Sequence, residues 1–278
     1  MHSTSGSTGT ARVRPPLKWA GGKYRVLAEI LPRLPAGARL VEPFVGSGAV
    51  FLNANYPRFH LNDANPDLVA FYRVLKQDGE RFIDRAEKLF HSRNNTPERF
   101  YALREEFNTA RDPEARSTIF LYLNRHSYNG LCRYNASGRF NVPFGRHARP
   151  YFPRRELQIC AGRLKRARIE NRDFEPVMRE AQPGDVIYCD PPYIPLSDTA
   201  NFTSYSTRAF GEPEQERLAR IAADLAKLGV PVLVSNHATE FTRRIYEPAK
   251  RHVFAVRRFI SCNGQRRIKT DEVLALFS

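Results

Sequence analysis

The chain has 278 residues, 42% of them hydrophobic, so it can bury one large core with an inserted module, and no apolar run approaches the roughly 20 residues of a membrane span. Its 44 lysines and arginines against 29 aspartates and glutamates give a formal net charge of +15, which favours nucleic acid as partner, although an anionic membrane surface, a ribosome or an arginine-biased genome would explain it too. Four widely spaced cysteines without a C-x-x-C pair argue against a zinc site and a disulfide framework, and indicate a reducing, cytoplasmic location.

The chain starts with a segment, residues 1–14, that is rich in serine, threonine and glycine at its beginning and lacks the apolar core of a signal peptide, which predicts a disordered tail. A glycine-containing loop follows, Lys18-Trp19-Ala20-Gly21-Gly22-Lys23, and apolar residues at helical spacing then run from Tyr24 to Leu31. Two lysines that flank the single tryptophan before a helix N-terminus can receive an anionic group. An ordinary capped helix with a packed tryptophan explains this stretch alone more simply.

A strand is expected over Arg39–Pro43, followed by a turn at Gly46-Ser47-Gly48 and a short helix over Ala49–Leu52. Glycines at a strand-to-helix turn let the backbone approach a ligand closely. The nicotinamide-binding pattern G-x-G-x-x-G needs a third glycine where this chain has Phe51, so a nicotinamide dehydrogenase is poorly supported.

A second strand is expected over Arg58–Leu61, and the carboxylate of Asp63 just beyond it can accept hydrogen bonds from the two hydroxyls of a ribose. An exposed turn aspartate is the alternative. From Asn65 onward the pattern is helical over a long span. Its apolar positions and further helical patterns are Leu68, Phe71, Tyr72 and Leu75 on one face, then Phe100–Phe107 and Ala115–Asn124.

The segment from Arg125 to Arg149 is dense in arginine, asparagine, tyrosine and glycine. Ala136-Ser137-Gly138 predicts a hairpin turn between Cys132–Asn135 and Arg139–Val142. Arginine and asparagine are the usual readers of guanine and adenine in the major groove, and an aromatic ring such as that of Tyr128 can stack in an opened duplex. The segment therefore predicts a DNA-reading surface, although a solvated charge or a phosphate contact explains any single arginine.

After Pro153 the patterns of strands and helices alternate again, and the basic run Arg163–Glu170 predicts a solvated face. Ser197–Ser206 is expected to form a polar loop that acts as a lid or touches DNA. The remaining expected elements are a helix with Leu218, Ile221, Leu225 and Leu228 on one stripe, a strand over Val230–Val234, a helix over Glu240–Tyr246, and closing strands over Val253–Ile260 and Val273–Phe277.

Between these comes Val186–Cys189, a short apolar run that predicts a buried central strand and stops at Asp190-Pro191-Pro192-Tyr193. Each proline holds the residue before it extended, and neither proline has an N–H, so this loop offers acceptors and few donors. Such a loop suits a ligand that donates hydrogens, such as an exocyclic amino group, and Tyr193 adds a ring on which a planar base can lie. A strand-to-loop turn with a solvated aspartate is the alternative for this tetrapeptide alone.

Five stretches occur in a fixed order, namely Lys18–Lys23, Glu42–Gly48, Tyr128–Asn135, Phe140–Arg146 and Asp190–Tyr193. In these stretches, and from about Leu17 to its C-terminus, the chain resembles the DNA adenine methyltransferase (Dam) family. The resemblance implies an α/β, Rossmann-like methyltransferase core with an inserted helical target-recognition domain that carries a β-hairpin. It implies a catalytic domain over residues 15–64 and 153–278, and a DNA-binding recognition domain over residues 65–152.

The resemblance further implies a nucleoid-associated enzyme that uses S-adenosylmethionine to methylate the N6 amine of adenine in double-stranded DNA, at GATC, without a metal or an obligate protein partner. The cofactor residues that it implies are Trp19, Lys23, Phe44, Gly46, Gly48, Asp63 and Asp190. The DNA-binding residues are Lys18, Tyr128, Asn129, Leu131, Arg133 and Arg146. His147 stands where similar members carry an aromatic residue, which puts one DNA contact in doubt.

The chemistry of the Asp190–Tyr193 loop can be argued beside the family. The adenine amine is a poor nucleophile because its lone pair is delocalised into the ring, so acceptors on both of its hydrogens would favour attack. We assign the Asp190 carboxylate and the Pro191 carbonyl to these roles, with Tyr193 stacking on a base that is flipped out at a cost on the order of a few kcal/mol. The methyl group would pass in line to N6. A free carboxylate is too weak a base to deprotonate a neutral aryl amine beforehand, so Asp190 acts first as an acceptor.

Three alternatives stay open. An N4-cytosine methyltransferase would use a nearly identical site, and only the recognition segment and the resemblance favour adenine. A catalytically silent DNA-binding protein would explain the charge but not the intact D-P-P-Y and both glycines. A nicotinamide oxidoreductase lacks its third glycine.

Overall fold

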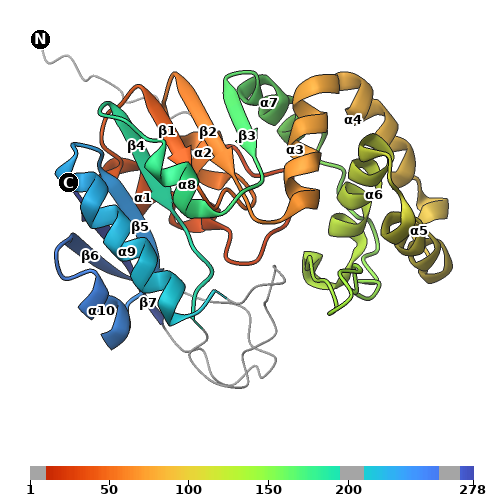
Figure 1. Ribbon diagram of the computed structural model, residues 1–278. Helices are drawn as coiled ribbons and strands as arrows, with labels where there is room; N and C mark the ends of the chain where they lie inside the picture. Colours follow the sequence, from red (N-terminus) through yellow and green to blue (C-terminus); the bar gives the residue numbers. More distant parts are fainter. Residues whose placement is uncertain (1–10, 195–209, 257–269) are drawn as a thin grey trace, which may run out of the picture.

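A computed structural model of the protein describes residues 11–194, 210–256 and 270–278. Within these residues seven strands form a mixed sheet in the order β3-β2-β1-β4-β5-β7-β6 (Figure 1). The strands are β1 Arg39–Glu42, β2 Arg58–Asn62, β3 Ala167–Glu170, β4 Asp185–Cys189, β5 Val232–His237, β6 Lys250–Val256 and β7 Thr270–Phe277.

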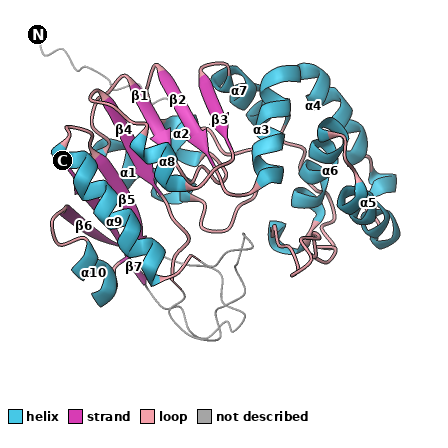
Figure 2. Ribbon diagram, in the orientation of Figure 1, coloured by secondary structure: helices cyan, strands magenta, loops and turns pink. Residues whose placement is uncertain are grey.

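Ten α-helices accompany this sheet in the described part of the chain (Figure 2). They are α1 Leu27–Ile30, α2 Ala49–Asn53, α3 Pro66–Asp78, α4 Glu80–Glu87, α5 Pro97–Thr109, α6 Pro113–His126, α7 Arg154–Leu164, α8 Phe174–Arg179, α9 Glu212–Lys227 and α10 Glu240–Ile245. None of the described helices is both long and apolar enough to cross a membrane.

The strand order reverses between β1 and β4. From β1 the chain moves outward through β2 to β3, and it then returns to the other side of β1 to form β4 and β5, all in parallel. Only β7 runs antiparallel to its neighbours β5 and β6. In open α/β sheets ligands bind outside the carboxyl ends of the strands at such a reversal, and here these ends are Glu42 and the residue after β4, Asp190.

Helices cover both faces of the sheet because successive strand residues point to opposite sides. Leu40 and Val186 pack into one core with residues of α1, α2, α3 and α7. Their neighbours Val41 and Ile187 pack into a second core with residues of α8 and α9. The apolar runs therefore form central strands that are buried on both faces, which confirms the expected α/β architecture.

Helices α4, α5 and α6 stand beside the sheet, beyond its β3 edge, rather than over a face (Figure 1). They share an aromatic core that includes fully buried Phe82, Phe100, Phe107 and Phe120. Asparagine, threonine or aspartate caps the N-terminus of α3, α5 and α6, and a proline follows each cap. This combination satisfies the first amide groups and presets the first helical turn, so these three helices begin where the sequence directs.

The expected hairpin is present only as a minimal ribbon. Tyr134 and Phe140 form an isolated antiparallel bridge, flanked by two backbone hydrogen bonds. Beyond it the second arm departs from the first, and Phe144 pairs with Ser127. The side chain of Asn108 on α5 accepts from the Phe140 N–H at 2.7 Å and donates to its carbonyl at 3.3 Å, so the outer edge of the ribbon is bonded to a helix rather than to a further strand.

Three other expectations need correction. Arg163 does not lie on a solvated face, because its guanidinium donates to the carbonyls of Phe51 and Ala54 at the end of α2, at 3.0 and 2.5 Å. The helix expected from Tyr24 to Leu31 is broken into α1 between two 3-10 turns. The strand expected over Val230–Val234 begins and ends later, as β5. The expected loop 197–206 and the end of the strand expected over Val253–Ile260 lie outside the described residues.

Candidate functional site

Asp190 follows β4, and one oxygen of its carboxylate is held in place. Lys23 Nζ lies 2.9 Å from Oδ1, and the hydroxyl of Ser235 on β5 donates to the same oxygen at 3.0 Å. The hydroxyl of Tyr188 lies 3.1 Å from Ser235 Oγ and can direct the serine proton toward Asp190. Among the described residues Oδ2 makes no hydrogen bond or ion pair, and the side chain is 20% exposed. The carboxylate thus presents one accessible acceptor oxygen.

Lys23 is the cation of this site, and it is only 5% exposed. Burial acts to lower its pKa, but the negative charges of Asp190 and Glu272 outweigh burial and raise the pKa above its ordinary value. Its ammonium also donates to the Gly21 carbonyl at 2.9 Å and lies 4.5 Å from the centre of the Tyr193 ring. Lys23 therefore stays charged and joins the first loop of the chain to the loop after β4.

The Asp190–Tyr193 loop is fixed from two further sides. Gln215 on α9, fully buried, donates to the Pro192 carbonyl at 2.9 Å, and the amide of Asn236 on β5 donates to Gln215 at 2.9 Å. The Tyr193 ring meets His237 edge to face at 4.4 Å between ring centres. The Pro192 carbonyl is thus engaged within the protein, and the loop conformation is set by β5 and α9.

The glycine turn after β1 is bonded on both sides of Gly46. The Gly46 N–H donates to Asp63 Oδ2 at 2.9 Å, and its carbonyl accepts from the buried Tyr72 hydroxyl at 2.8 Å. Gly46 has a φ of 48°, and a Cβ built on it would lie 3.1 Å from the Trp19 ring. This left-handed position under the indole favours glycine, because a side chain there would be strained and would push the ring away. Trp19, Gly46 and Asp63 therefore lie close together at the carboxyl ends of β1 and β2.

Asp63 is an unusual carboxylate, because both of its oxygens accept backbone N–H groups, Oδ1 from Asn65 and Oδ2 from Gly46, each at 2.9 Å. Burial nevertheless raises its pKa from 3.8 to about 6. Two other expected cofactor residues, Phe44 and Gly48, belong to the same turn after β1. Phe44 packs against Phe174 at 5.3 Å between ring centres, and Gly48 adopts a φ of 73° as the N-cap of α2.

Glu42 is a residue to which the sequence alone gave no role. It ends β1 and is 2% exposed, and its Oε1 has no hydrogen-bond partner among the described residues. Burial, together with the nearby charge of Asp190, raises the pKa of Glu42 well above its ordinary value. A signal was available, since Glu42 opens the Glu42–Gly48 stretch at a strand end. Ser235, Gln215 and Glu272 were also missed, and they lie on elements far along the chain.

The expected DNA-reading residues gather around the turn Tyr128–Gly130. Tyr128 is 51% exposed and Asn129 is exposed with a φ of 53°. A Cβ on Gly130 would overlap the side chain of Lys18, so the loop before Trp19 and this turn are packed together. Arg133 donates to the Asn141 carbonyl at 2.8 Å across the ribbon.

The remaining expected DNA-binding residues lie on either side of the turn. Leu131 directly follows it and is partly buried, whereas Arg146 is exposed with a φ of 52°. His147, which departs from the family pattern, lies with Nε2 3.2 Å from the Ser127 carbonyl.

A buried polar network holds the ribbon to α3. Asp67, in the first turn of α3, accepts from Arg116 on α6 at 2.5 and 3.1 Å and from the Tyr134 hydroxyl at 2.6 Å. Asn65 caps the same helix and donates its N–H to Asp63. The start of α3 therefore contacts both the ribbon, through Asp67, and the carboxylate of Asp63, through Asn65.

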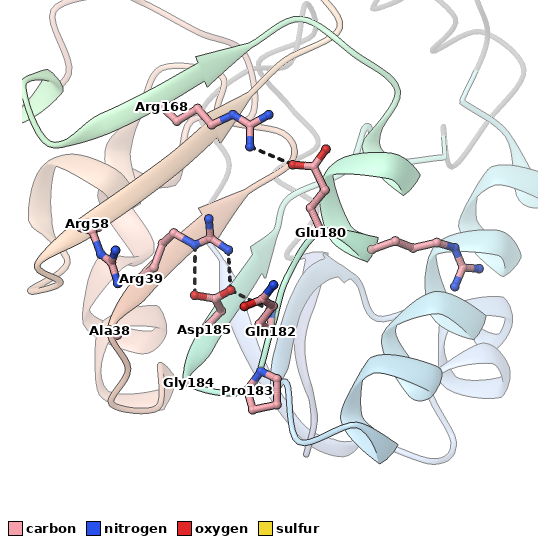
Figure 3. Close-up of a pocket in the computed structure, with 10 residues that line it drawn as sticks. Ala38, Arg39, Arg58, Arg168, Glu180, Gln182, Pro183, Gly184 and Asp185 are labelled. Carbon is pink, nitrogen blue, oxygen red and sulfur yellow. Dashed lines mark hydrogen bonds and ion pairs between the residues drawn. The ribbon is translucent and has the colours of Figure 1, made fainter.

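A hollow of about 560 Å³ lies at the opposite, amino ends of β1, β2 and β4 (Figure 3). Arg39 and Asp185 pair across it at 3.0 and 2.5 Å, and Arg168 pairs with Glu180 at 2.9 Å. Its charges are largely neutralised within the protein, and it is remote from Asp190 along the strands. This hollow is therefore a salt-bridged edge rather than the candidate site.

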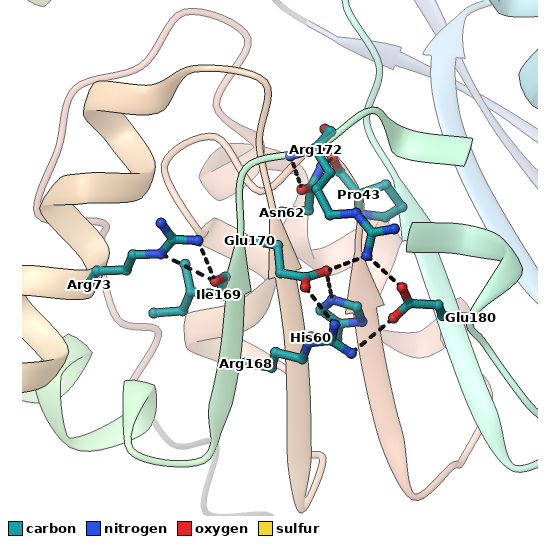
Figure 4. Close-up of polar contacts among 9 residues, drawn as sticks. All are labelled: Pro43, His60, Asn62, Arg73, Arg168, Ile169, Glu170, Arg172 and Glu180. Atoms are coloured by element: carbon teal, nitrogen blue, oxygen red, sulfur yellow. Dashed lines mark hydrogen bonds and ion pairs between the residues drawn. The ribbon is translucent and has the colours of Figure 1, made fainter. Parts of the chain in front are cut away.

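On the β3 edge, His60, Glu170 and Glu180 lie close enough together to be considered as metal ligands (Figure 4). Arg168 and Arg172 both bridge the two glutamates, and His60 Nε2 lies 2.9 Å from Glu170. Two guanidinium groups balance the two carboxylates, so the cluster has no net negative charge with which to attract a metal ion. The cluster therefore joins β2, β3 and the end of α8 through salt bridges.

Three comparisons bear on these arrangements. A family model described as D12 class N6 adenine-specific DNA methyltransferase matches residues 19–260. A DNA adenine methylase of Salmonella typhi is 51% identical over 261 residues, which cover 94% of each chain, and that of Escherichia coli K12 is 50% identical with the same coverage. A DNA adenine methylase of Vibrio cholerae is 49% identical over 263 residues, 94% of this chain and 95% of the other. Among solved structures, a precorrin 8w decarboxylase of Methanobacterium thermoautotrophicum aligns with 92% of this chain and 89% of its own at 11% identity, with a TM-score of only 0.37.

Proposed function

Because the chain belongs to the family of D12 class N6 adenine-specific DNA methyltransferases, we propose that it takes its methyl group from S-adenosylmethionine and acts on GATC in double-stranded DNA. The chain is an adenine-specific DNA methyltransferase. What we propose beyond this activity is the identity of the cofactor, the duplex DNA target with its sequence, and the roles of individual residues.

The grouping of Trp19, Gly46 and Asp63 supports the cofactor. The left-handed glycine turn keeps side chains away and so leaves room for a flat, polar ligand. The Asp63 carboxylate beside it can accept hydrogen bonds from the two hydroxyls of a ribose. The buried Oε1 of Glu42, which has no hydrogen-bond partner in the described part of the chain, offers a further acceptor at the end of β1, and this suits a ligand that carries an ammonium group. In this proposal Trp19, Phe44, Gly46, Gly48 and Asp63 hold the nucleoside part. When bound, S-adenosylmethionine supplies the methyl group, and its sulfur keeps the electron pair of the broken S–C bond.

The carboxylate of Asp190 carries the proposed catalytic role. Its Oδ1 is anchored by Lys23 and Ser235, which leaves Oδ2 to accept one hydrogen of the adenine amine. The Pro191 carbonyl accepts the other hydrogen, because the Pro192 carbonyl is already engaged by Gln215. Two acceptors in fixed positions favour the tetrahedral nitrogen that attack requires. After the methyl group has arrived, N6 is cationic and acidic, and the proton that it loses passes to Oδ2 of Asp190 and from there to solvent. Tyr193 offers its ring to the flipped base.

We assign DNA recognition to residues 65–152, within which α4, α5, α6 and the ribbon stand beside the sheet (Figure 1). The exposed Tyr128 enters or fills the opened stack, while Lys18, Asn129, Leu131, Arg133 and Arg146 contact the target. The chain's net charge of +15 supports contact with the phosphate backbone. The GATC target rests on similarity to the DNA adenine methylases.

The test is transfer of a tritiated methyl group from S-adenosylmethionine to a duplex with one GATC, followed by nucleoside analysis. N6-methyladenine in this duplex, and little in duplexes that differ from it by one base pair, is the expected result. N4-methylcytosine, or equal labelling of all duplexes, would contradict the proposal. Asp190→Asn should lower the transfer rate by about 10²–10³-fold while DNA binding persists, because one preorganised charge contact is lost. Asp224→Asn, the same change on an exposed face of α9, should leave the rate unchanged.

A further inference from the structure

One side-chain amide joins the loop before Trp19 to the recognition turn. Asn124, near the end of α6, is 1% exposed. Its Oδ1 accepts from the Lys18 N–H at 2.9 Å, and its Nδ2 donates to the Lys18 carbonyl at 2.7 Å. The same Nδ2 lies 3.4 Å from the Gly130 carbonyl. The amide therefore bonds Lys18 in both directions, as a neighbouring strand would, and also reaches the turn.

The two segments that Asn124 joins are also packed against each other. Gly130 has a φ of 65°, and a Cβ there would overlap Cβ and Cδ of Lys18. Lys18 is followed at once by Trp19, which is assigned to the cofactor, and Gly130 is preceded by the exposed Asn129. A change at Asn124 would therefore shift Lys18 relative to the recognition turn.

The ammonium of Lys18 depends on this backbone anchor for its placement. Among the described residues no acidic side chain forms an ion pair with Lys18, and burial and the positive charge of Arg125, itself only 8% exposed, lower the pKa of Lys18. Like charges repel, so Arg125 does not hold the Lys18 ammonium in place. Backbone constraints on Lys18 therefore matter for its placement, and Asn124 supplies one of them.

We propose that Asn124 is a positioning residue for target recognition, which sets the distance between the Lys18 side chain and the turn Tyr128–Gly130. The inference rests on the proposed function, because it assigns Lys18 and the turn to the DNA target. Asn124 itself touches neither base nor cofactor in this proposal. Its loss should therefore change which sites are methylated more than how fast the preferred site is methylated.

The chain contains a matched control. Asn53, at the end of α2, accepts from the Val13 N–H at 2.8 Å and donates to the Val13 carbonyl at 2.9 Å, with a third bond to Ala49 at 2.8 Å. Its amide thus makes the same two-way clamp on an extended segment, but neither Val13 nor Ala49 belongs to the proposed DNA surface. Asn53→Ala and Asn124→Ala remove equivalent bonds at two places.

The experiment measures kcat/KM for the preferred duplex and for duplexes in which one base pair of the target, other than that of the methylated adenine, is changed. Discrimination is the ratio of kcat/KM for the preferred duplex to that for an altered duplex. Anisotropy titrations measure binding to the same duplexes. The ratio between two duplexes does not depend on the fraction of folded enzyme, so a destabilised variant still gives an answer. Asn124→Ala should reduce the ratio about tenfold, as expected for one misplaced base contact. Asn53→Ala should leave it unchanged. Lys18→Ala should reduce discrimination at the same base pair, and the double variant should be no worse than Lys18→Ala.

An unchanged ratio in Asn124→Ala, or an equal fall in Asn53→Ala, would overturn the inference. A separate result tests the proposed function, because the wild-type enzyme by itself reports whether GATC is preferred. If it prefers another site, that site replaces GATC in the comparison, and the variants test Asn124 in the same way.

Discussion

The ionisation of Asp63 is expected to make cofactor binding depend on pH just below neutrality. Burial raises the pKa of Asp63 from 3.8 to about 6. Only the ionised carboxylate can accept both ribose hydroxyls while it also accepts the N–H groups of Gly46 and Asn65. Because the folded-state pKa is raised, the binding-competent form is complete above about pH 7 and is lost as the pH falls through about 6.

The size of the effect follows from the fraction of ionised protein. At about pH 5, one unit below the pKa, roughly a tenth of the free protein carries the ionised form, so the apparent Kd should be about tenfold higher than at neutral pH. Asp63→Asn removes a charge-assisted acceptor. It should weaken binding by about 10–100-fold at neutral pH and abolish the pH dependence.

Trp19 provides the assay, because it is the single tryptophan of the chain and its ring lies against Gly46. Its fluorescence should report titration with S-adenosylhomocysteine, which lacks the transferable methyl group, over about pH 5 to 8. Glu42→Gln separates the two buried carboxylates at these strand ends: its affinity should fall at every pH, because Glu42 is proposed to contact the ligand, but the step near pH 6 should remain. A flat affinity in the wild type, or a slope that survives in Asp63→Asn, would refute the role of Asp63.

Two further substitutions test the supports of the site. Lys23→Met keeps the buried aliphatic stem but removes the ammonium beside Asp190. Single-turnover methyl transfer should slow by about 10–100-fold, while DNA binding measured by anisotropy should stay unchanged. A wild-type rate would show that the ion pair is dispensable. Tyr134→Phe removes the 2.6 Å hydrogen bond to Asp67 and should lower the free energy of unfolding, measured in urea, by about 1–2 kcal/mol. Tyr101→Phe, at a tyrosine that is 39% exposed, should leave this free energy unchanged. Equal effects of the two substitutions would contradict a stabilising role of the buried network.

The parts of the fold that could be predicted are those fixed by local pattern. The apolar run before Asp190 must be buried in any compact structure, and the glycines after Glu42 require a turn, so both ends of the site were evident. Three capped helices begin at Asn-Pro, Thr-Pro and Asp-Pro pairs that act within a few residues.

The parts that could not be predicted depend on distant neighbours. Arg163 looks like a surface charge in the sequence, yet its long stem places the guanidinium 5.1 Å from the Phe59 ring and against the end of α2. Ser235 and Gln215 sit in ordinary apolar patterns, and they gain a role only because β5 and α9 happen to adjoin the Asp190 loop. The hairpin turn was predicted, but Asn108, on a helix, takes the hydrogen bonds that a longer ladder would have used.

The attachment of α4, α5 and α6 also has an evolutionary consequence. The chain leaves the sheet layer through α3 and re-enters it through α7, and these two helices pack against each other, while Lys76 of α3 bonds Ala167 of β3 at 2.8 Å. Both ends of the excursion are thus anchored at one place, as in domains that tolerate insertion and exchange. A lineage could acquire a new target by replacing the excursion and keep the methyl-transfer machinery intact. Such a cassette would have to bring with it an equivalent of the Asn124 amide, since this side chain reaches back to Lys18 outside the exchanged part.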